Sequence, residues 1–227
     1  MGVLYNSRIV TDGLVLCLDA GDRMSYPGAG TTWTDLTANK NNMTLYNGPS
    51  FTTENGGAVV FDGTDDYAQN INTNFAQTSN FTVETSVKLN VNLSAGTWVI
   101  FSTYDGSNGY QLVWASSYFY FYRGGIQLTT VSLSSTFFSG DILNLVTVWD
   151  NSNINNCSIL INNEDKTDTR NSTSASNGTD PLTFNRRGDL MAFPLGHDMH
   201  LFRFYNRALS AEEIRQNYNA TKGRFGL

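Results

Sequence analysis

Short runs of alternating hydrophobic and polar residues recur along the chain, with the two-residue period of a β-strand. From Phe81 to Leu89, mainly apolar side chains (Phe, Val, Thr, Val, Leu) occupy every second position, and Thr, Glu, Ser and Lys stand between them. This pattern predicts a strand with one face in a core. Further strands are predicted at Gly13–Asp19, Ala58–Phe61, Thr97–Thr103, Tyr110–Trp114, Tyr118–Tyr122, Ile126–Val131, Ile142–Trp149, Ser158–Asn162 and Met199–Tyr205.

Turn-forming residues separate these runs, for example Asn47-Gly48-Pro49, Asn55-Gly56-Gly57 and the segment 105–109. The segment Asp62–Asp66 is predicted to be a hairpin turn with Asp-Gly at its tip. Many short strands at near-regular spacing predict an antiparallel sandwich of two sheets. Neither a linker nor an internal repeat divides the chain, so we expect an N-terminal arm (1–8) and a single domain (9–227).

Only one segment has the signature of a helix, and it directly follows the strand that ends at Tyr205. Ser210 and Glu213 stand at the two ends of a capping box, in which each side chain accepts a hydrogen bond from the other residue's backbone N–H. Leu209 and Ile214 occupy the positions of a hydrophobic staple, which fixes the angle between the preceding chain and the helix. We therefore predict one short helix near the C-terminus.

Several of these segments, taken in order, resemble a known family. They are Gly13–Asp19 leading to Trp33–Leu36, then Phe61–Tyr67, Phe81–Glu84 and Tyr205–Ile214. In this order they resemble the laminin G-like, concanavalin A-type jelly-roll family, which implies an all-β, two-sheet antiparallel jelly-roll sandwich with one short C-terminal helix. More narrowly, Ile9–Leu14, Ser25–Gly28 and Asn217–Gly226 resemble the version found in structural proteins of marine tailed phages.

Charge and composition exclude some partners. The formal net charge is −6, only 15% of the residues are charged, and the longest basic run is Arg186-Arg187. A surface that follows phosphates needs Lys and Arg on one face, so neither nucleic acid nor an anionic membrane is expected as a partner. No segment is long and apolar enough for insertion in a membrane, and the N-terminus lacks an apolar signal core. Cys17 and Cys157 lie in apolar runs and are interpreted as buried free thiols, with a disulfide as the alternative.

Together with the phage resemblance, the acidic and polar composition predicts a non-enzymatic virion structural protein. It would be an exterior capsid decoration or a tail- or fibre-associated subunit, made in the host cytoplasm and exposed on the virion surface. Its partners would be other capsid or tail proteins and further copies of itself. The alternative is a lectin-like adhesion module that binds host-surface glycans, and the two roles are compatible.

Glycan cleavage is not expected. Polysaccharide-cleaving relatives of the jelly roll carry paired carboxylates on one strand, whereas Glu84 stands alone on its strand and is predicted to fix a loop or a neighbouring strand. His197 and His200 are three residues apart, so on a strand they would point to opposite faces and would not share a metal. We expect a loop-to-strand transition there, with one partly exposed histidine.

No cofactor is required, but calcium is the metal that fits best, because it prefers carboxylate and amide oxygens on irregular loops. The resemblance implies a site where the first strand meets the following loop, and the matching residues are Asp19, Asp35 and Asn41. The alternative is turn and capping chemistry, since such side chains readily bond nearby backbone N–H groups.

The segment Tyr118–Tyr122 alternates Tyr and Phe. On a strand, Phe119 and Phe121 would enter the core, while Tyr118, Tyr120 and Tyr122 would form a flat row with hydroxyl groups, joined by Trp114 from the preceding strand. Such a row can contact another protein, line a solvated edge without binding anything, or stack on sugar rings, and we weigh the three in that order.

Overall fold

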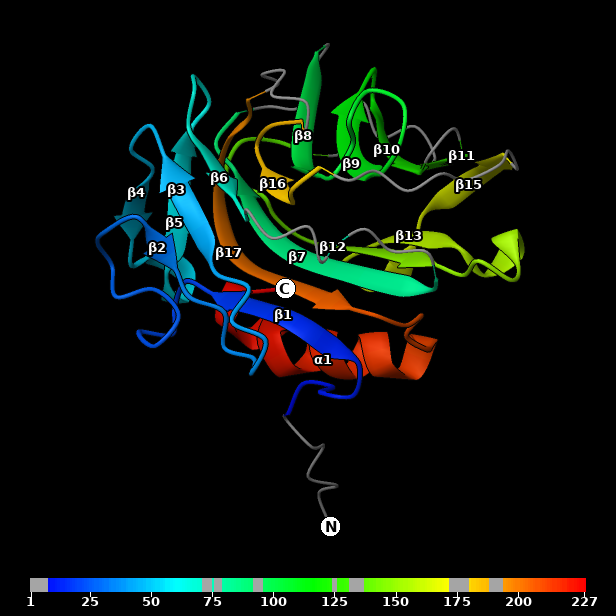
Figure 1. The fold of residues 1–227 in the computed structure, drawn as a ribbon, viewed down its shortest axis with the longest axis horizontal. Helices are drawn as coiled ribbons and strands as arrows, with labels where there is room; N and C mark the ends of the chain where they lie inside the picture. Colours follow the sequence, from blue (N-terminus) through cyan, green and yellow to red (C-terminus); the bar gives the residue numbers. More distant parts are fainter. Residues whose placement is uncertain are drawn as a thin grey trace.

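The computed structural model describes residues 8–70, 75, 79–91, 96–123, 126–130, 137–171, 180–187 and 194–227. Over these residues the chain forms two antiparallel sheets packed face to face, with one helix outside them (Figure 1). The predicted all-β sandwich with a single C-terminal helix is confirmed for this part of the chain.

The sheet next to the helix, here called sheet A, is built around its longest strand, β17 (Gly196–Tyr205). On one side β17 pairs with β7 (Phe81–Leu89), and on the other with β1 (Leu14–Asp19) and β5 (Ala58–Asp62). Sheet A is completed by β12 (Ile142–Trp149), β13 (Ser158–Ile161), β14 (Glu164–Asp165) and β4 (Ser50–Thr52).

The opposite sheet, here called sheet B, is built from nine strands within the described residues. Neighbouring strands are antiparallel, and three of the nine are only two or three residues long. In spatial order they are β15 (Thr167–Asn171), β11 (Ile126–Thr130), β10 (Tyr118–Arg123), β9 (Tyr110–Ala115), β8 (Thr97–Ser102), β16 (Thr183–Phe184), β6 (Tyr67–Gln69), β3 (Met43–Tyr46) and β2 (Thr32–Trp33). The single-turn helices η1 (Glu54–Gly56) and η2 (Ile154–Asn156) lie in connections.

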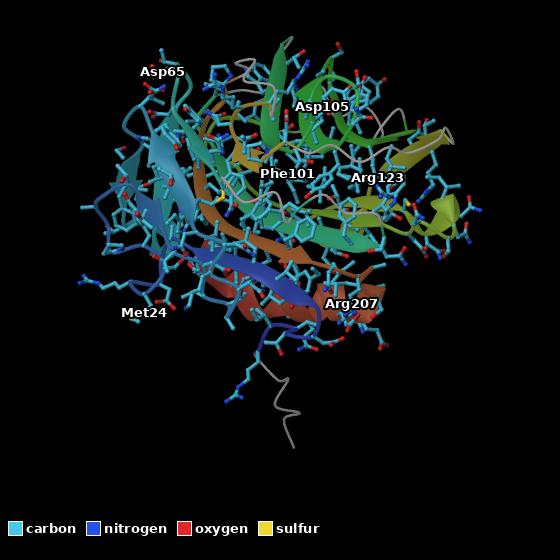
Figure 2. The ribbon with its side chains drawn as sticks, in the orientation of Figure 1. Met24, Asp65, Phe101, Asp105, Arg123 and Arg207 are labelled. Atoms are coloured by element: carbon cyan, nitrogen blue, oxygen red, sulfur yellow. The ribbon has the colours of Figure 1, made fainter. Side chains whose placement is uncertain are left out.

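The main core fills the space between the sheets with aromatic side chains. Phe81 of β7 stacks on Phe204 of β17, with ring centroids 5.5 Å apart. From sheet B, Phe121 contacts Phe81 and Phe101 contacts Phe202 of β17, and all these rings are fully buried. Phe101 lies between the two layers in Figure 2. The alternation of the sequence therefore directs one face of each long strand into a common interior.

Helix α1 (Ala211–Phe225) covers the outer face of sheet A and creates a second, smaller core. The predicted capping box is confirmed, because Ser210 accepts from the backbone N–H of Glu213 and the Glu213 carboxylate accepts from that of Ser210. Leu209 and Ile214 are buried in one cluster with Val146 of β12, as the staple predicts. None of the described helices has the length and apolar character needed to cross a bilayer.

Two details of the strand predictions change. The turn at Asp62–Asp66 is not a hairpin: Asp62 ends β5 in sheet A, and Tyr67 begins β6 in sheet B, so the turn carries the chain from one sheet to the other. Gly63 permits the crossing, because its φ is +80° and an added Cβ would lie 2.7 Å from the backbone N of Gly196. The predicted strand Ile126–Val131 corresponds to β11, and Val131 lies outside the described residues.

Cys17 and Cys157 are both free and buried, which confirms the interpretation as unpaired thiols. Burial raises the pKa of each thiol. Both groups therefore remain protonated at neutral pH and behave as small apolar side chains.

Candidate functional site

A row of tyrosines lies on the outer face of sheet B. Tyr118, Tyr120 and Tyr122 of β10 are half-buried, whereas Phe119 and Phe121 between them are buried in the core. Successive tyrosine ring centroids lie 5.8 Å apart in both pairs, and the rings of Tyr120 and Tyr122 are stacked. The predicted alternation is thus confirmed, and it leaves three adjacent aromatic rings on one surface.

Trp114 does not join this row. It is fully buried and packs edge-on against Phe119, at 5.0 Å between ring centroids. The reason is register: Trp114 pairs with Phe119 across β9 and β10, and paired residues point to the same face of a sheet. The tyrosine row, as we name it, therefore consists of Tyr118, Tyr120 and Tyr122.

A buried amide lies beside the row. Gln111 pairs with Tyr122 across β9 and β10, and only 7% of its surface is exposed. Its side-chain oxygen has no hydrogen-bond partner among the described residues. Burial, together with nearby Tyr120 and Tyr104, raises the pKa of Tyr122, so its phenol remains protonated and can both donate and accept a hydrogen bond. The Tyr122 phenol is therefore the hydrogen-bonding group that this end of the row presents at the surface.

A second aromatic group lies on strands β3 and β6. Tyr46 and Tyr67 are cross-strand partners whose rings stack with centroids 4.7 Å apart and planes inclined by 7°. The guanidinium carbon of Arg186 lies 4.5 Å from the centre of the Tyr67 ring. Sequence reasoning missed this group because its members are far apart along the chain. The sequence feature that could have indicated this group is that Tyr46 and Tyr67 each adjoin a turn rich in Asn, Gly and Asp.

Both aromatic groups lie on the same face of sheet B. A continuous line of paired residues runs across the sheet from Gln69 through Thr183, Ser102 and Gln111 to Tyr122. Side chains along such a line share a face, and Tyr67 shares it too because it lies two residues before Gln69. The outer face of sheet B is therefore aromatic at two places.

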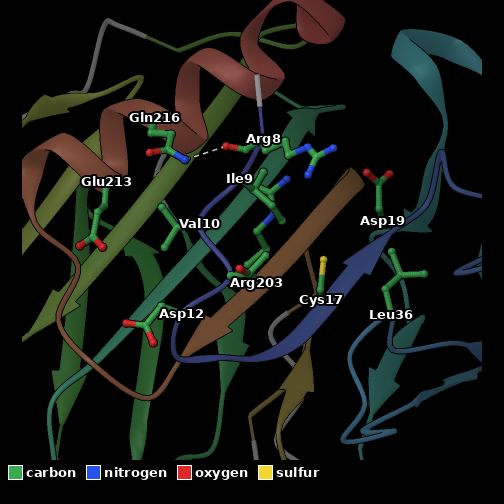
Figure 3. A pocket seen from close by; sticks show the side chains of 11 residues that line it. Arg8, Ile9, Val10, Asp12, Cys17, Asp19, Leu36, Arg203, Glu213 and Gln216 are labelled. Carbon is green, nitrogen blue, oxygen red and sulfur yellow. Dashed lines mark hydrogen bonds between the residues drawn. The ribbon is translucent and has the colours of Figure 1, made fainter. Parts of the chain in front are cut away.

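A cavity of about 770 Å³ lies on the side of the molecule opposite to the tyrosine row, between α1, β1 and the N-terminal segment (Figure 3). Gln216 of α1 donates a hydrogen bond of 2.8 Å to the backbone oxygen of Arg8, so the chain's own segment forms one wall. None of its lining residues is aromatic, and therefore the cavity lacks the flat apolar surface that the tyrosine row offers. It is lined by Arg8, Ile9, Val10, Thr11, Asp12, Cys17, Asp19, Leu36, Arg203, Glu213 and Gln216.

The side chains predicted to bind calcium have protein partners instead. Both carboxylate oxygens of Asp19 lie within hydrogen-bond distance of Arg224 Nη1, at 2.7 and 2.8 Å. The backbone N–H of Gly21 also donates to this carboxylate. Asp19 thus joins the end of β1 to helix α1, and a guanidinium occupies the side on which a cation would bind.

Asp35 and Asn41 tie the following loop to β1. The buried Asp35 carboxylate accepts backbone N–H bonds from Cys17, Thr37 and Asn41, at 2.9–3.0 Å. The Asn41 side chain donates to the backbone oxygen of Val15. These contacts match the turn and capping alternative rather than a calcium site.

One acidic group satisfies a metal-like spacing among the described residues, namely Asp62, Asp65 and Asp66, whose oxygens lie within 4.8 Å of one another. Asp62 accepts from the backbone N–H of Thr64, and Asp66 accepts from that of Asp62. Two of the three carboxylates therefore stabilise the turn between the sheets.

The two histidines do not form a metal site. His197 stacks on Phe61, and His200 packs on Phe225 of α1, both with ring centroids 5.0 Å apart. The prediction that they face opposite sides is confirmed. The expected partial exposure is wrong, because both are fully buried: the segment is the start of the central strand β17 and not a loop. Burial lowers the pKa of His200 and lowers that of His197 to about 4.

Glu84 holds neighbouring elements together, as predicted. Its buried carboxylate lies 3.2 Å from Arg203 Nη1 of β17 and accepts from Asn144 of β12 and from Asn217 of α1. No other acidic residue lies on β7. The paired carboxylates of a glycosidase are therefore absent from this strand.

The sequence profile of the concanavalin A-like lectin/glucanases superfamily matches residues 62–215. A search of curated proteins finds no match. Among solved structures, the binding domain of Paraclostridial Mosquitocidal Protein 1 superposes with a TM-score of 0.70 at 14% identity, covering 92% of this chain and 52% of that one.

Two further structures show the same fold. The receptor binding domain of botulinum neurotoxin C/D mosaic serotype gives a TM-score of 0.68 at 15% identity and covers 91% of this chain and 51% of that one. Trypanosoma rangeli sialidase in complex with 2,3-difluorosialic acid gives a TM-score of 0.68 at 15% identity, over 95% of this chain and 34% of that one. This chain thus spans about half of each binding domain and a third of the sialidase, and identities this low establish the fold alone.

The profile match covers more than half of the chain and agrees with the observed two-sheet jelly-roll sandwich. The chain belongs to the concanavalin A-like lectin/glucanases superfamily, as its resemblance to laminin G-like domains predicts.

Proposed function

We propose that this protein is a carbohydrate-binding module whose ligand lies along the tyrosine row. The observation that carries the proposal is the set of three half-buried rings on one strand, spaced 5.8 Å apart. The faces of a pyranose ring are flat and carry C–H groups, while its rim carries hydroxyls. Tyrosine offers the complement, an apolar ring with a polar tip, and it loses little conformational entropy on binding.

The membership in a lectin/glucanase superfamily supports a glycan over a protein as the ligand of this row. Fold alone does not determine function, so the argument rests on the row itself.

The proposal is for binding without catalysis. Glycoside hydrolysis ordinarily needs two carboxylates about 5–10 Å apart on either side of the scissile bond. The carboxylate of Glu84 is buried between sheet A and α1, on the side of the sandwich opposite to the tyrosine row. Measured turnover of a polysaccharide by the purified protein would overturn this part of the proposal.

A glycan array with the purified protein tests the binding function. We expect wild-type protein to bind, and Tyr120→Ala to lower affinity about tenfold or more, since it removes the central ring of the row. Tyr120→Phe keeps the ring and should retain most of the affinity. Tyr218→Ala is the matched control, because Tyr218 is also half-buried but lies on α1, behind sheet A. The proposal would be refuted if the folded protein binds no glycan on the array, or if Tyr120→Ala binds as tightly as the wild-type protein.

We propose further that the module is carried on the exterior of a tailed-phage particle, on the capsid or on the tail. The support is the resemblance of Ile9–Leu14, Ser25–Gly28 and Asn217–Gly226 to phage structural proteins. Its partners there would be other virion proteins and further copies of the chain, and host-surface glycans would be its external ligand. Peptide mass spectrometry of purified particles tests this location, and particles that lack the chain would refute it.

A further inference from the structure

A small polar cavity lies on the outer face of sheet B, beside the second aromatic group. Its volume is about 180 Å³, roughly that of six waters at about 30 Å³ each. That volume is on the scale of a single sugar ring. Asp65, one of its lining residues, lies at the edge of the molecule, far from Arg207 beside α1 (Figure 2). The lining residues are Asn47, Asp65, Asp66, Tyr67, Asn185, Arg186 and Pro194.

Two asparagines fix the walls of this cavity. Asn47 donates a hydrogen bond of 2.8 Å to the backbone oxygen of Asp65. Asn185, itself buried, donates to the backbone oxygen of Asp66 and accepts from the N–H of Leu195. Because these bonds join three connections that are distant in sequence, the cavity is held in shape before any ligand arrives, which lowers the entropic cost of binding.

Asp66 contributes a largely buried carboxylate to the cavity lining. Only 4% of its surface is exposed. Its Oδ2 accepts from the backbone N–H of Asp62, at 3.0 Å. Carboxylate oxygens accept charge-assisted hydrogen bonds, which are stronger than neutral ones. The adjacent Asp65 carboxylate is exposed and adds a second acceptor.

The cavity lining also contains a cation and a phenol. The Arg186 guanidinium lies over Tyr67, and Tyr67 itself stacks on Tyr46. The Tyr67 hydroxyl can both donate and accept. A small anion would meet the carboxylates of Asp65 and Asp66, and a small cation would meet Arg186. A neutral group with several hydroxyls suits both kinds of charge, because each hydroxyl donates and accepts at once.

Two arginine–tyrosine contacts lie between the cavity and the tyrosine row. Arg186 lies over Tyr67, and the next residue, Arg187, lies over Tyr104, 5.3 Å from its ring centre. Tyr104 lies two residues beyond Ser102, which is on the line of paired residues that reaches Gln111 and Tyr122. Both arginine–tyrosine contacts therefore lie towards the same face of sheet B as the tyrosine row.

We propose that this cavity is a second subsite, which binds one neutral sugar residue at the end of the glycan whose chain lies along the tyrosine row. The inference rests on the proposed carbohydrate-binding function. It adds that recognition of the terminal residue comes from the carboxylates of Asp65 and Asp66 and from Arg186, while the tyrosine row contributes stacking that is tolerant of sugar type.

The test compares Asp65→Asn with Asp62→Asn by isothermal titration with an array-selected oligosaccharide, in buffer containing EDTA. Asp65 lines the cavity and Asp62 does not, yet both are exposed acids of the same turn and each variant removes one negative charge. We expect Asp65→Asn to lower affinity about tenfold, the effect of one charged hydrogen bond, and Asp62→Asn to change it by less than about twofold. Melting curves of each variant exclude unfolding as the cause.

A second probe separates the two subsites. Saturation-transfer NMR measures the binding of methyl glycosides of glucose, galactose, mannose and N-acetylglucosamine to the two variants. We expect at least one of these glycosides to bind to Tyr120→Ala and not to Asp65→Asn. If the oligosaccharide depends on Tyr120 but Asp65→Asn binds it like wild type, the cavity is not a subsite and the proposed function stands. Equal losses of affinity in Asp65→Asn and Asp62→Asn would also contradict the proposed subsite. The same holds if EDTA abolishes binding by the wild-type protein. If wild-type protein binds no glycan, the proposed function itself fails.

Discussion

Protonation of His197 is expected to destabilise the fold at mildly acidic pH. The side chain is fully buried, stacks on Phe61, and is hydrogen-bonded through Nδ1 to the backbone oxygen of Leu195 at 2.9 Å. Its Nε2 has no partner among the described residues. A second proton would therefore place a charge in the main core with no group to accept its hydrogen bond.

The magnitude follows from the two pKa values. Burial lowers the pKa of His197 from 6.5 to about 4 in the folded protein. Between these values the unfolded chain binds more protons than the folded one, so stability falls as the pH decreases. The full effect, present below pH 4, is on the order of 3 kcal/mol at 1.36 kcal/mol for each pKa unit. This is a large part of the total stability of an ordinary domain.

Urea unfolding followed by tryptophan fluorescence, repeated from neutral pH down to pH 4, measures this loss. His197→Asn retains a donor near the position of Nδ1 but does not titrate, so its stability should depend less steeply on pH. His200, whose pKa is also lowered by burial, contributes to the pH dependence of stability that remains in His197→Asn. Asp150 and Glu213 act in a lower pH window, because hydrogen bonds from Ser152 and Arg207 lower their pKa values to about 2. An identical pH dependence in wild type and His197→Asn would refute the reasoning.

Three further substitutions test other contacts. Glu84→Gln should cost about 3 kcal/mol of unfolding free energy, because it leaves the buried Arg203 guanidinium without a counter-charge; Glu212→Gln, on the exposed surface of α1, is the control and should change stability by less than about 0.5 kcal/mol. Asp19→Asn should cost about 1 kcal/mol through loss of the Arg224 ion pair, equally in millimolar calcium and in EDTA, and a calcium-dependent loss would restore the metal site. Ser210→Ala should cost about 1 kcal/mol in thermal or urea unfolding through loss of the helix cap, and unchanged stability would contradict the role of the capping box.

The sequence predicts best those features that depend on a regular local pattern. The nine-residue alternation of β7 and the Tyr/Phe alternation of β10 determine which side chains enter the core. The capping box at Ser210 and Glu213 lies within four residues, so it can be recognised without tertiary information. The tyrosine row, which is the core of the proposed site, belongs to this class.

The features that the sequence does not predict depend on pairing between distant strands. Trp114 is in the core because β9 pairs with β10 in a register that places it opposite Phe119. The strands that carry Tyr67 and Phe184 are only three and two residues long, too short to show a period. The Tyr46, Tyr67 and Arg186 group, and the cavity beside it, arise only when β3, β6 and the chain after β16 come together.

A crystal structure of the protein with an array-selected oligosaccharide measures most directly which surface binds the ligand. The proposed function predicts sugar rings stacked on Tyr118, Tyr120 and Tyr122, on the outer face of sheet B. A ligand bound instead in the cavity between β1 and α1, or the failure of every tested glycan to bind folded protein, would contradict the proposed function.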